Sequence, residues 1–367
     1  MATEVVEVVR NKKKGTRRKG SLPKLVCFHP VVDGPRFDRG VPEIEYGEET
    51  GPTHLVVMVN GIIGRAGDLR FAAKKLVKRF PNDIIVHRSR CNSNTKTFHG
   101  VDVMGTRLAN EVQSVIKDHT EFTKISFVAH SLGGLVARYA VAKLYHKNQS
   151  TETATSKEEG GTGRIAGLEA MNFVTFATPH LGSKWHRQVP LLCGSLYLEK
   201  VLSRSSRLLG NTGKHLCLTD KDENGKPLLC RMVKDSEDIK FISSLRAFKR
   251  RVVYSNAHFD LIVGWKSSSI RRQNEIPERK DFKPISDRYP HIVNLDISEG
   301  VPISEESNDM EEAMIQGLST LSWERVDVSF LRSIQRFNAH NTILVKTRYL
   351  SWHGSDVIKH MIDHLMK

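Results

Sequence analysis

The residue pattern that most clearly indicates chemistry surrounds Ser131. An apolar run at 125–128 leads into the segment 129–134, which reads Ala-His-Ser-Leu-Gly-Gly, and apolar residues then recur at helical spacing as far as Leu144. This order predicts a strand that turns sharply, presents a serine hydroxyl and continues at once as a helix. Small residues at 129 and 133 suit so tight a turn, and the helix start favours negative charge beside the hydroxyl. The pattern therefore indicates a nucleophilic serine.

A serine nucleophile requires two further groups. The hydroxyl is weak at neutral pH, so it needs a base within hydrogen-bond reach and an acid that orients the base. Such groups lie just beyond the carboxyl ends of strands in open α/β sheets. Asp260 follows the strand-like run 251–255, and His340 follows the strand-like run 325–330. We predict that Ser131 attacks the substrate, that His340 is the base, and that Asp260 orients it.

Several other residues remain alternatives for the base and the acid. The chain has 16 histidines, so a suitably placed histidine alone is weak support. His353 also lies after the last predicted strand, and Asp296 also ends a strand-like run. His258 could reach the site but precedes the chosen acid. Asp220 and Asp222 have the surroundings of solvated turn residues.

Backbone donors must also stabilise the oxyanion that forms when an ester carbonyl is attacked. One donor is expected to be the amide of Leu132, and the other should come from Gly61 or Ile62, in the turn after the first core strand. Gly61 would let the backbone approach the substrate, although a plain strand-to-helix turn also favours glycine. His180 and Leu181 follow a predicted strand and are candidate substrate contacts, and a structural role is the alternative for His180.

The elements that would position these residues alternate between strand and helix. Helical spacing of apolar residues predicts helices at 69–77, 108–116 and 357–365. Short apolar runs predict strands at 55–59, 83–86, 124–128, 173–177, 252–254, 291–295 and 325–330. This alternation indicates a mostly parallel central sheet flanked by helices. The region at about 184–248 interrupts it with helical or irregular sequence, which predicts either a lid over the site or an ordinary packed insertion.

Length and composition restrict the class of protein. With 367 residues, of which 39% are hydrophobic, the chain can form one α/β domain, which we place at 51–367 after a basic, partly flexible segment at 1–50. We expect no membrane span, because no run approaches the roughly 20 apolar residues required, and no secretory signal. Five irregularly spaced cysteines favour reduced thiols and a cytoplasmic location over a disulfide framework or a zinc site.

Part of the net charge of +15 is concentrated between Arg10 and Lys19. This basic arm predicts contact with an anionic membrane surface or an import receptor, and a solvated tail is the alternative. A peripheral membrane position and organelle targeting therefore both remain open. No nucleic-acid recognition module accompanies the arm, so we expect no nucleic-acid partner. Without a phosphate-binding loop or a metal-binding motif, we expect neither cofactor nor metal. The oligomeric state is left open.

These motifs together resemble a known family. The segments 55–61, 129–134 and 178–182, together with 91–94, 105–109 and 263–265, are similar to the putative serine esterase family of α/β-hydrolases, known from plants and fungi as putative lipases. The resemblance extends from about residue 53 to about residue 367. It implies an α/β-hydrolase fold and hydrolysis of carboxylic esters, chiefly lipid or acyl esters, without a cofactor. An acyltransferase or thioesterase on the same fold, or a non-catalytic membrane-associated scaffold, is the alternative.

Overall fold

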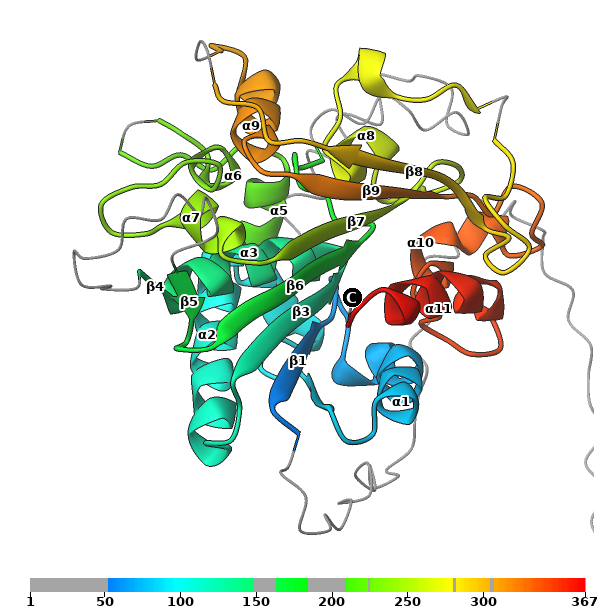
Figure 1. The fold of residues 1–367 in the computed structure, drawn as a ribbon. Helices are drawn as coiled ribbons and strands as arrows, with labels where there is room; N and C mark the ends of the chain where they lie inside the picture. The colour runs from blue at the N-terminus through cyan, green and yellow to red at the C-terminus, as the bar shows by residue number, and fades with distance from the viewer. Residues whose placement is uncertain are drawn as a thin grey trace, which may run out of the picture. The chain divides into compact units, whose positions relative to one another are not determined.

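A seven-stranded sheet forms the centre of the described structure (Figure 1). The computed structural model describes residues 52–147, 163–183, 209–223, 225–279, 282–303 and 307–366, all within the unit Thr50–Lys367. The basic segment at 1–50, with its arm from Arg10 to Lys19, lies outside the described residues. The sheet order is β2-β1-β3-β6-β7-β9-β8. Its strands are β1 His54–Val59, β2 Ile84–Arg88, β3 Lys124–His130, β6 Glu169–Phe176, β7 Arg250–Asn256, β8 Ile292–Ser298 and β9 Trp323–Val328.

All but one of the strand pairings in this sheet are parallel. The exception joins β9 to the edge strand β8, which runs antiparallel to it. Each predicted strand corresponds to one of these seven, and the strand ends differ by only a few residues. The prediction of a mostly parallel sheet flanked by helices is therefore confirmed.

Helices cover both faces of the sheet, which explains why its central strands are continuously apolar. In β1, the odd-numbered apolar residues pack into one core cluster and the even-numbered ones into the other. Helices on the first face pack against the odd-numbered side, and helices on the second face pack against the even-numbered side (Figure 1). The helices of the first face are α2 Val101–Asp118 and α3 Leu132–Leu144, and those of the second are α1 Arg70–Arg79 and α11 Ser355–Asp363.

The region expected as an insertion is described from residue 209 onward. Leu229 and Leu245 are fully buried there in the core cluster that α2 and α3 share. The Thr212 hydroxyl accepts a hydrogen bond of 3.0 Å from the amide of Gly100, directly before α2. This part is packed into the fold, whereas residues 184–208 lie outside the described residues. Its helices are α5 Gly210–Leu216, α6 Leu228–Arg231 and α7 Phe241–Arg246.

Short elements complete the described part of the chain, in which no helix is both long and apolar enough to cross a membrane. Two of them matter for the site, because α8 and α10 follow the loops that leave β7 and β9 (Figure 1). The short elements are η1 Ala66–Leu69, η2 Asn94–Phe98, β4 Tyr145–Lys147, β5 Gly163–Ile165, α8 Trp265–Ser269, η4 Gln273–Glu275, α9 Met310–Ser319, η6 Arg336–Asn338, α10 Ala339–Thr342 and η7 Trp352–Gly354.

Candidate active site

The turn between β3 and α3 holds Ser131 in an unusual backbone conformation. Its φ of 54° and ψ of −130° lie in a region that side-chain-bearing residues rarely occupy. The surrounding backbone fixes this geometry: the Ser131 amide donates to the carbonyl of Phe176 at 2.8 Å, and its carbonyl accepts from the Thr178 hydroxyl at 2.9 Å. Strain maintained in this way is typical of functional positions.

Two glycines allow β1 and the turn after it to approach this serine. A Cβ atom on Gly133 would lie 2.6 Å from the carbonyl oxygens of Val59 and Asn60. A Cβ atom on Gly61 would lie 2.8 Å from the Cβ atom of Ser131. Real Cβ atoms do not come this close to other atoms, so larger residues at 61 or 133 would push the turn after β1 away from the serine. The sequence expectation of small residues at 61 and 133 thus has a structural reason.

The structure brings Ser131, His340 and Asp260 together from three separate strand ends. His340 Nε2 lies 3.0 Å from Ser131 Oγ, and His340 Nδ1 lies 3.0 Å from Asp260 Oδ2. An ionised carboxylate can only accept hydrogen bonds, so Nδ1 carries the proton and Nε2 is free to accept the serine hydroxyl proton. The His340 and Asp260 side chains are almost entirely shielded from solvent. This arrangement can activate the hydroxyl as a nucleophile.

Asp260 is held as an anion despite its burial. Burial acts to raise the pKa of Asp260. The charge and hydrogen bond of His340, and the hydrogen bonds from Val263 and Asn256, act to lower this pKa and outweigh burial, so the pKa of Asp260 lies below its usual value. Asp260 Oδ1 accepts from the amides of Ile262 at 3.0 Å and Val263 at 2.8 Å. Asn256 Nδ2 donates to Oδ2 at 2.8 Å. These fixed donors orient the carboxylate toward His340.

His130 also contacts His340, and this contact was not predicted from the sequence. Its Nε2–H donates to the backbone carbonyl of His340 at 2.8 Å, and the two ring centroids lie 4.8 Å apart. Burial and the neighbouring His340 lower the pKa of His130 well below its usual value, so this ring is neutral. The only sequence signal was its place beside Ser131, which does not reveal a partner 210 residues away.

The amides proposed for the oxyanion hole are available. Within the described part of the chain, no acceptor takes a hydrogen bond from the amides of Gly61, Ile62 or Leu132. The turn that carries Gly61 is held in place by Asn60, whose Nδ2 donates to the carbonyls of Asn92 at 3.0 Å and Gly61 at 3.1 Å. The Asn60 side chain therefore orders the turn rather than meeting a substrate.

His180 and Leu181 lie in the interior, and the prediction that they contact substrate needs correction. Neither residue has any exposed surface, and Leu181 belongs to the core beside α2 and α3. His180 Nε2 lies 3.0 Å from the Thr175 hydroxyl, and its ring contacts Trp323. Although both residues follow β6, the chain turns inward there, so they pack the fold, as the structural alternative for His180 supposed.

The alternative acids and bases lie elsewhere in the described structure. His353 is hydrogen-bonded to the Ser333 hydroxyl at 2.9 Å, and His258 to that of Ser329 at 3.0 Å. Asp296 lies 3.4 Å from Arg271 and is part of a different cluster. Among the described residues, no group of three or more His, Cys, Asp or Glu side chains could hold a metal ion. The residues that the structure brings together are thus those predicted as nucleophile, base and acid.

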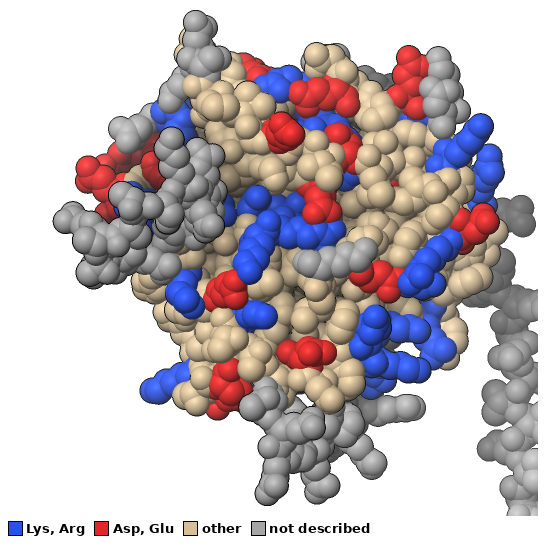
Figure 2. Space-filling model, in the orientation of Figure 1, with Lys and Arg blue, Asp and Glu red and all other residues tan. Residues whose placement is uncertain are grey.

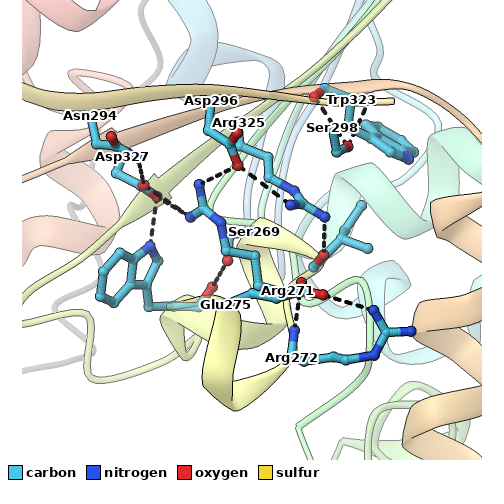
Figure 3. A network of polar contacts seen from close by, with 12 residues as sticks. Ser269, Arg271, Arg272, Glu275, Asn294, Asp296, Ser298, Trp323, Arg325 and Asp327 are labelled. Atoms are coloured by element: carbon cyan, nitrogen blue, oxygen red, sulfur yellow. Dashed lines mark hydrogen bonds and ion pairs between the residues drawn. The ribbon is translucent and has the colours of Figure 1, made fainter. Parts of the chain in front are cut away.

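A second buried carboxylate, Asp327, lies near the end of β9 (Figure 3). Arg271 Nη1 donates to both of its oxygens, at 2.8 and 2.9 Å. Trp265 Nε1 donates to Oδ1 at 2.6 Å and Asn294 Nδ2 to Oδ2 at 2.9 Å. Because Trp265 begins α8, five residues after Asp260, this network anchors the helix that follows the acid loop.

Three features define a protein of the α/β-hydrolase class. They are the sheet order, the strained turn at Ser131, and the placement of Asp260 after β7 and of His340 after β9. A comparison with known families agrees. The chain belongs to the family described as "Putative serine esterase (DUF676)", whose match covers residues 49–270.

Two relatives in Saccharomyces cerevisiae carry the name of lipase. The chain is 32% identical to "Putative lipase ROG1" over 221 residues, which are 59% of this chain and 28% of that protein. It is 29% identical to "Putative lipase YDL109C" over 278 residues, which are 72% of this chain and 38% of that protein. The chain thus spans well under half the length of these relatives.

Two solved structures show a partial likeness to this chain. The mature form of the Bacillus licheniformis lipase BlEst2 has 12% identity and a TM-score of 0.34, and the match covers 59% of this chain and 69% of that chain. An extracellular α/β-hydrolase from a Paenibacillus species has 11% identity and a TM-score of 0.34, with 79% and 97% covered. At such identities the likeness concerns the fold alone.

Proposed function

We propose that the protein is a serine esterase that cleaves carboxylic esters, with lipid or acyl esters as its substrates, through Ser131, His340 and Asp260. The observation that carries the proposal is the unbroken hydrogen-bonded chain from Ser131 Oγ through both nitrogens of His340 to Asp260, with 3.0 Å at each step. Membership of the serine esterase family supports the reaction, and the names of the yeast relatives support a lipid substrate.

In the first half-reaction, Ser131 Oγ attacks the ester carbonyl carbon while its proton passes to His340 Nε2. The carbonyl oxygen becomes an oxyanion, which the amides of Leu132 and of Gly61 or Ile62 stabilise. The ester C–O bond then breaks, and the departing alcohol oxygen takes the proton from His340. The acyl group remains bound to Ser131.

In the second half-reaction, water replaces the alcohol. His340 Nε2 removes a proton from the water as its oxygen attacks the acyl carbonyl, and the same proton returns to Ser131 Oγ when the acid leaves. Asp260 stabilises the positive charge on His340 in both halves. The anionic state of Asp260, which its fixed donors favour, is the state that this role requires.

A chain-length series of soluble acyl esters tests this function. We expect the wild-type protein to hydrolyse them, and Ser131→Ala and His340→Ala each to lower kcat by roughly 10⁴-fold or more, because the triad acts as a unit. The profile over chain length would identify the acyl group that the site prefers.

Thermal unfolding of the same variants is the control, since a folded but inactive variant separates chemistry from stability. Hydrolysis by a folded Ser131→Ala variant at the wild-type rate would contradict the proposal. Transfer of the acyl group to an added alcohol or thiol in preference to water would instead indicate an acyltransferase. A cytoplasmic location and membrane contact through Arg10–Lys19 remain predictions.

A further inference from the structure

Exposed large apolar side chains gather mainly in two parts of the chain, residues 285–303 and residues 331–352. Six of the sixteen that the described residues expose lie between residues 331 and 352, and Ile334 and Tyr349 are 87% and 86% exposed. Isolated exposed apolar residues are ordinary, but a group of them marks an interaction surface. We call this group the apolar rim, which consists of Leu331, Ile334, Phe337, Tyr349, Leu350 and Trp352.

Side-chain contacts join the two halves of the apolar rim. His353, next to Trp352, is hydrogen-bonded through its ring to the Ser333 hydroxyl at 2.9 Å and through its amide to Gln335 Oε1 at 3.1 Å. Segments 331–337 and 349–352 therefore lie side by side, on the chain between β9 and α11. The six rim residues therefore come from two adjoining segments.

The apolar rim borders the candidate active site. Phe337 lies three residues before His340, and its ring contacts that of Phe259, directly before Asp260, at 5.3 Å between centroids. Leu261 and Ile262, directly after Asp260, expose their apolar side chains as well. The loops that carry the base and the acid thus both present apolar side chains to solvent.

The charge of the rim is positive. From residue 328 to residue 355 the chain contains no Asp or Glu, whereas Arg332, Arg336, Lys346 and Arg348 fall within it. Lys346 pairs with Asp68 at 3.2 Å. Arg332, Arg336 and Arg348 are exposed, and within the described part of the chain no carboxylate pairs with them. On the view of Figure 2, Lys and Arg side chains also gather over α1 and α11; α11 contacts η7 at the end of this segment, and α1 contacts α11.

We infer that the apolar rim docks on an anionic lipid bilayer and thereby brings the candidate active site to its lipid substrate. This inference rests on the proposed function. Exposed tryptophan and tyrosine suit the headgroup region, where one end of the ring is wet, and leucine and isoleucine enter the acyl boundary. Exposed arginines that no carboxylate neutralises complement the negative surface of an anionic leaflet. A protein partner would need acidic groups around an apolar pocket, and a second copy of this rim would oppose its own arginines.

Vesicle binding by the full chain tests this inference. Ser131→Ala is introduced throughout so that vesicle lipid is not hydrolysed. We expect binding to vesicles of phosphatidylcholine with phosphatidylserine, weaker binding without phosphatidylserine, and a decrease with added salt. In the variant Ile334→Ser, Leu350→Ser, Trp352→Ser, the partition coefficient should fall by about tenfold or more, because the buried apolar area is lost.

A matched control comes from the edge strand β8, where Leu295 and Ile297 are also exposed but are accompanied by Asp296 and Glu299. The variant Leu295→Ser, Ile297→Ser should bind vesicles as the parent does. For charge, Arg332→Gln with Arg348→Gln should weaken binding to anionic vesicles by roughly tenfold or more, since each basic residue at the surface contributes about fivefold. Lys117→Gln with Lys143→Gln removes the same charge at the far ends of α2 and α3 and should have little effect.

The fluorescence of Trp352 reports contact with the bilayer directly, without a variant that loses binding. In a Trp185→Phe background, brominated phospholipids should quench the fluorescence of Trp352 on binding. Trp352→Phe should then remove that quenching, because Trp265 and Trp323 are buried.

The inference is overturned if the rim variant binds anionic vesicles as tightly as the parent, if Trp352 is not quenched, or if the rim variant loses self-association in place of vesicle binding. Hydrolysis of a water-soluble short-chain ester, measured with Ser131 intact, separates the two proposals. Activity on that ester without vesicle binding would reject the docking surface and leave the proposed esterase function intact. Vesicle binding without activity would reject the esterase function and leave the docking surface intact.

Discussion

Asp260 and Asp327 are both buried carboxylates, one after β7 and one on the neighbouring strand β9, yet their partners differ in kind. Asp260 is bound to His340, whose other nitrogen meets Ser131. Asp327 is bound to the Trp265 indole, the Arg271 guanidinium and an amide, all of which keep their protons at neutral pH (Figure 3). In the first set, a proton can pass between Ser131 and His340 while Asp260 stays an anion, whereas no partner of Asp327 can exchange a proton in this way.

The comparison shows that burial and a full set of hydrogen bonds do not by themselves mark a functional acid. Both carboxylates have several donors, so a count of bonds would not separate them. What distinguishes Asp260 is that its partner His340 is also hydrogen-bonded to Ser131, the proposed nucleophile. Loss of Asp260 should therefore affect rate, and loss of Asp327 should affect stability.

The largest expected effect is on the rate of the variant Asp260→Asn. An amide at this position can no longer hold the Nδ1 proton of His340 in place or stabilise the imidazolium, so kcat/KM for a soluble ester should fall by roughly 10⁴-fold. Ester hydrolysis measured beside thermal unfolding checks this. A folded variant within tenfold of the wild-type rate would mean that Asp260 is not the orienting acid.

The variant Asp327→Asn should lose stability instead. Removing the charge leaves the Arg271 guanidinium, whose side chain is 1% exposed, without its buried counter-ion, and we expect a cost of about 3–5 kcal/mol in the free energy of unfolding. Urea unfolding measures this, and kcat per folded molecule should stay near the wild-type value. If activity collapses while stability is unchanged, the distinction between the two carboxylates fails.

Lower pH should destabilise the fold through histidines that are buried and neutral. Burial, the largest cause, lowers the pKa of His54 to about 4 and that of His360 to about 3. Below pH 6.5 the unfolded chain therefore binds more protons than the folded one, so stability falls as pH falls, by up to about 1.4 kcal/mol per pH unit for each histidine.

The free energy of unfolding between pH 6.5 and about 5 tests this, because carboxylates with lowered pKa values, such as Asp260, lose their contribution only at lower pH. The variant His54→Gln should reduce the slope. A stability that is constant or rises as pH falls across this window would contradict the neutral, buried state of these histidines.

The smallest effect is expected for His130→Gln. The loss of the bond to the His340 carbonyl, and of the ring that packs on His340, should lower kcat by about fivefold and change KM little, as for a hydrogen bond worth roughly 1 kcal/mol. The control His180→Gln removes a histidine that is equally buried but lies in the core, and it should reduce stability without reducing kcat. Equal effects of both variants on kcat would show that His130 does not position the base.

The sequence allowed the sheet and the three converging side chains to be predicted because their signals are local. A buried parallel strand is apolar along its whole length, and the residues after its carboxyl end face one edge. His130 was missed because its partner is a carbonyl 210 residues away, and no pattern near Ser131 indicates that bond. The Asp327 network was missed for the same reason, since its members come from α8, β8, β9 and the segment after α8.

His180 and Leu181 illustrate the opposite error. Their place after a strand suggested the edge of the site, but direction matters as well as position. Leu181 packs in the core, and His180 is turned toward Thr175. The positions of strands along the chain can be predicted from the sequence, whereas the path of a loop depends on packing that the sequence does not display.

Covalent labelling with a fluorophosphonate, followed by peptide mass spectrometry, tests the central claim most directly. An activated serine should be modified at Ser131 in the folded wild-type protein, and labelling should be lost in Ser131→Ala and slowed severely in His340→Ala. Folded wild-type protein that takes up no label, or that carries the label on another serine, would contradict the assignment of Ser131 as the nucleophile.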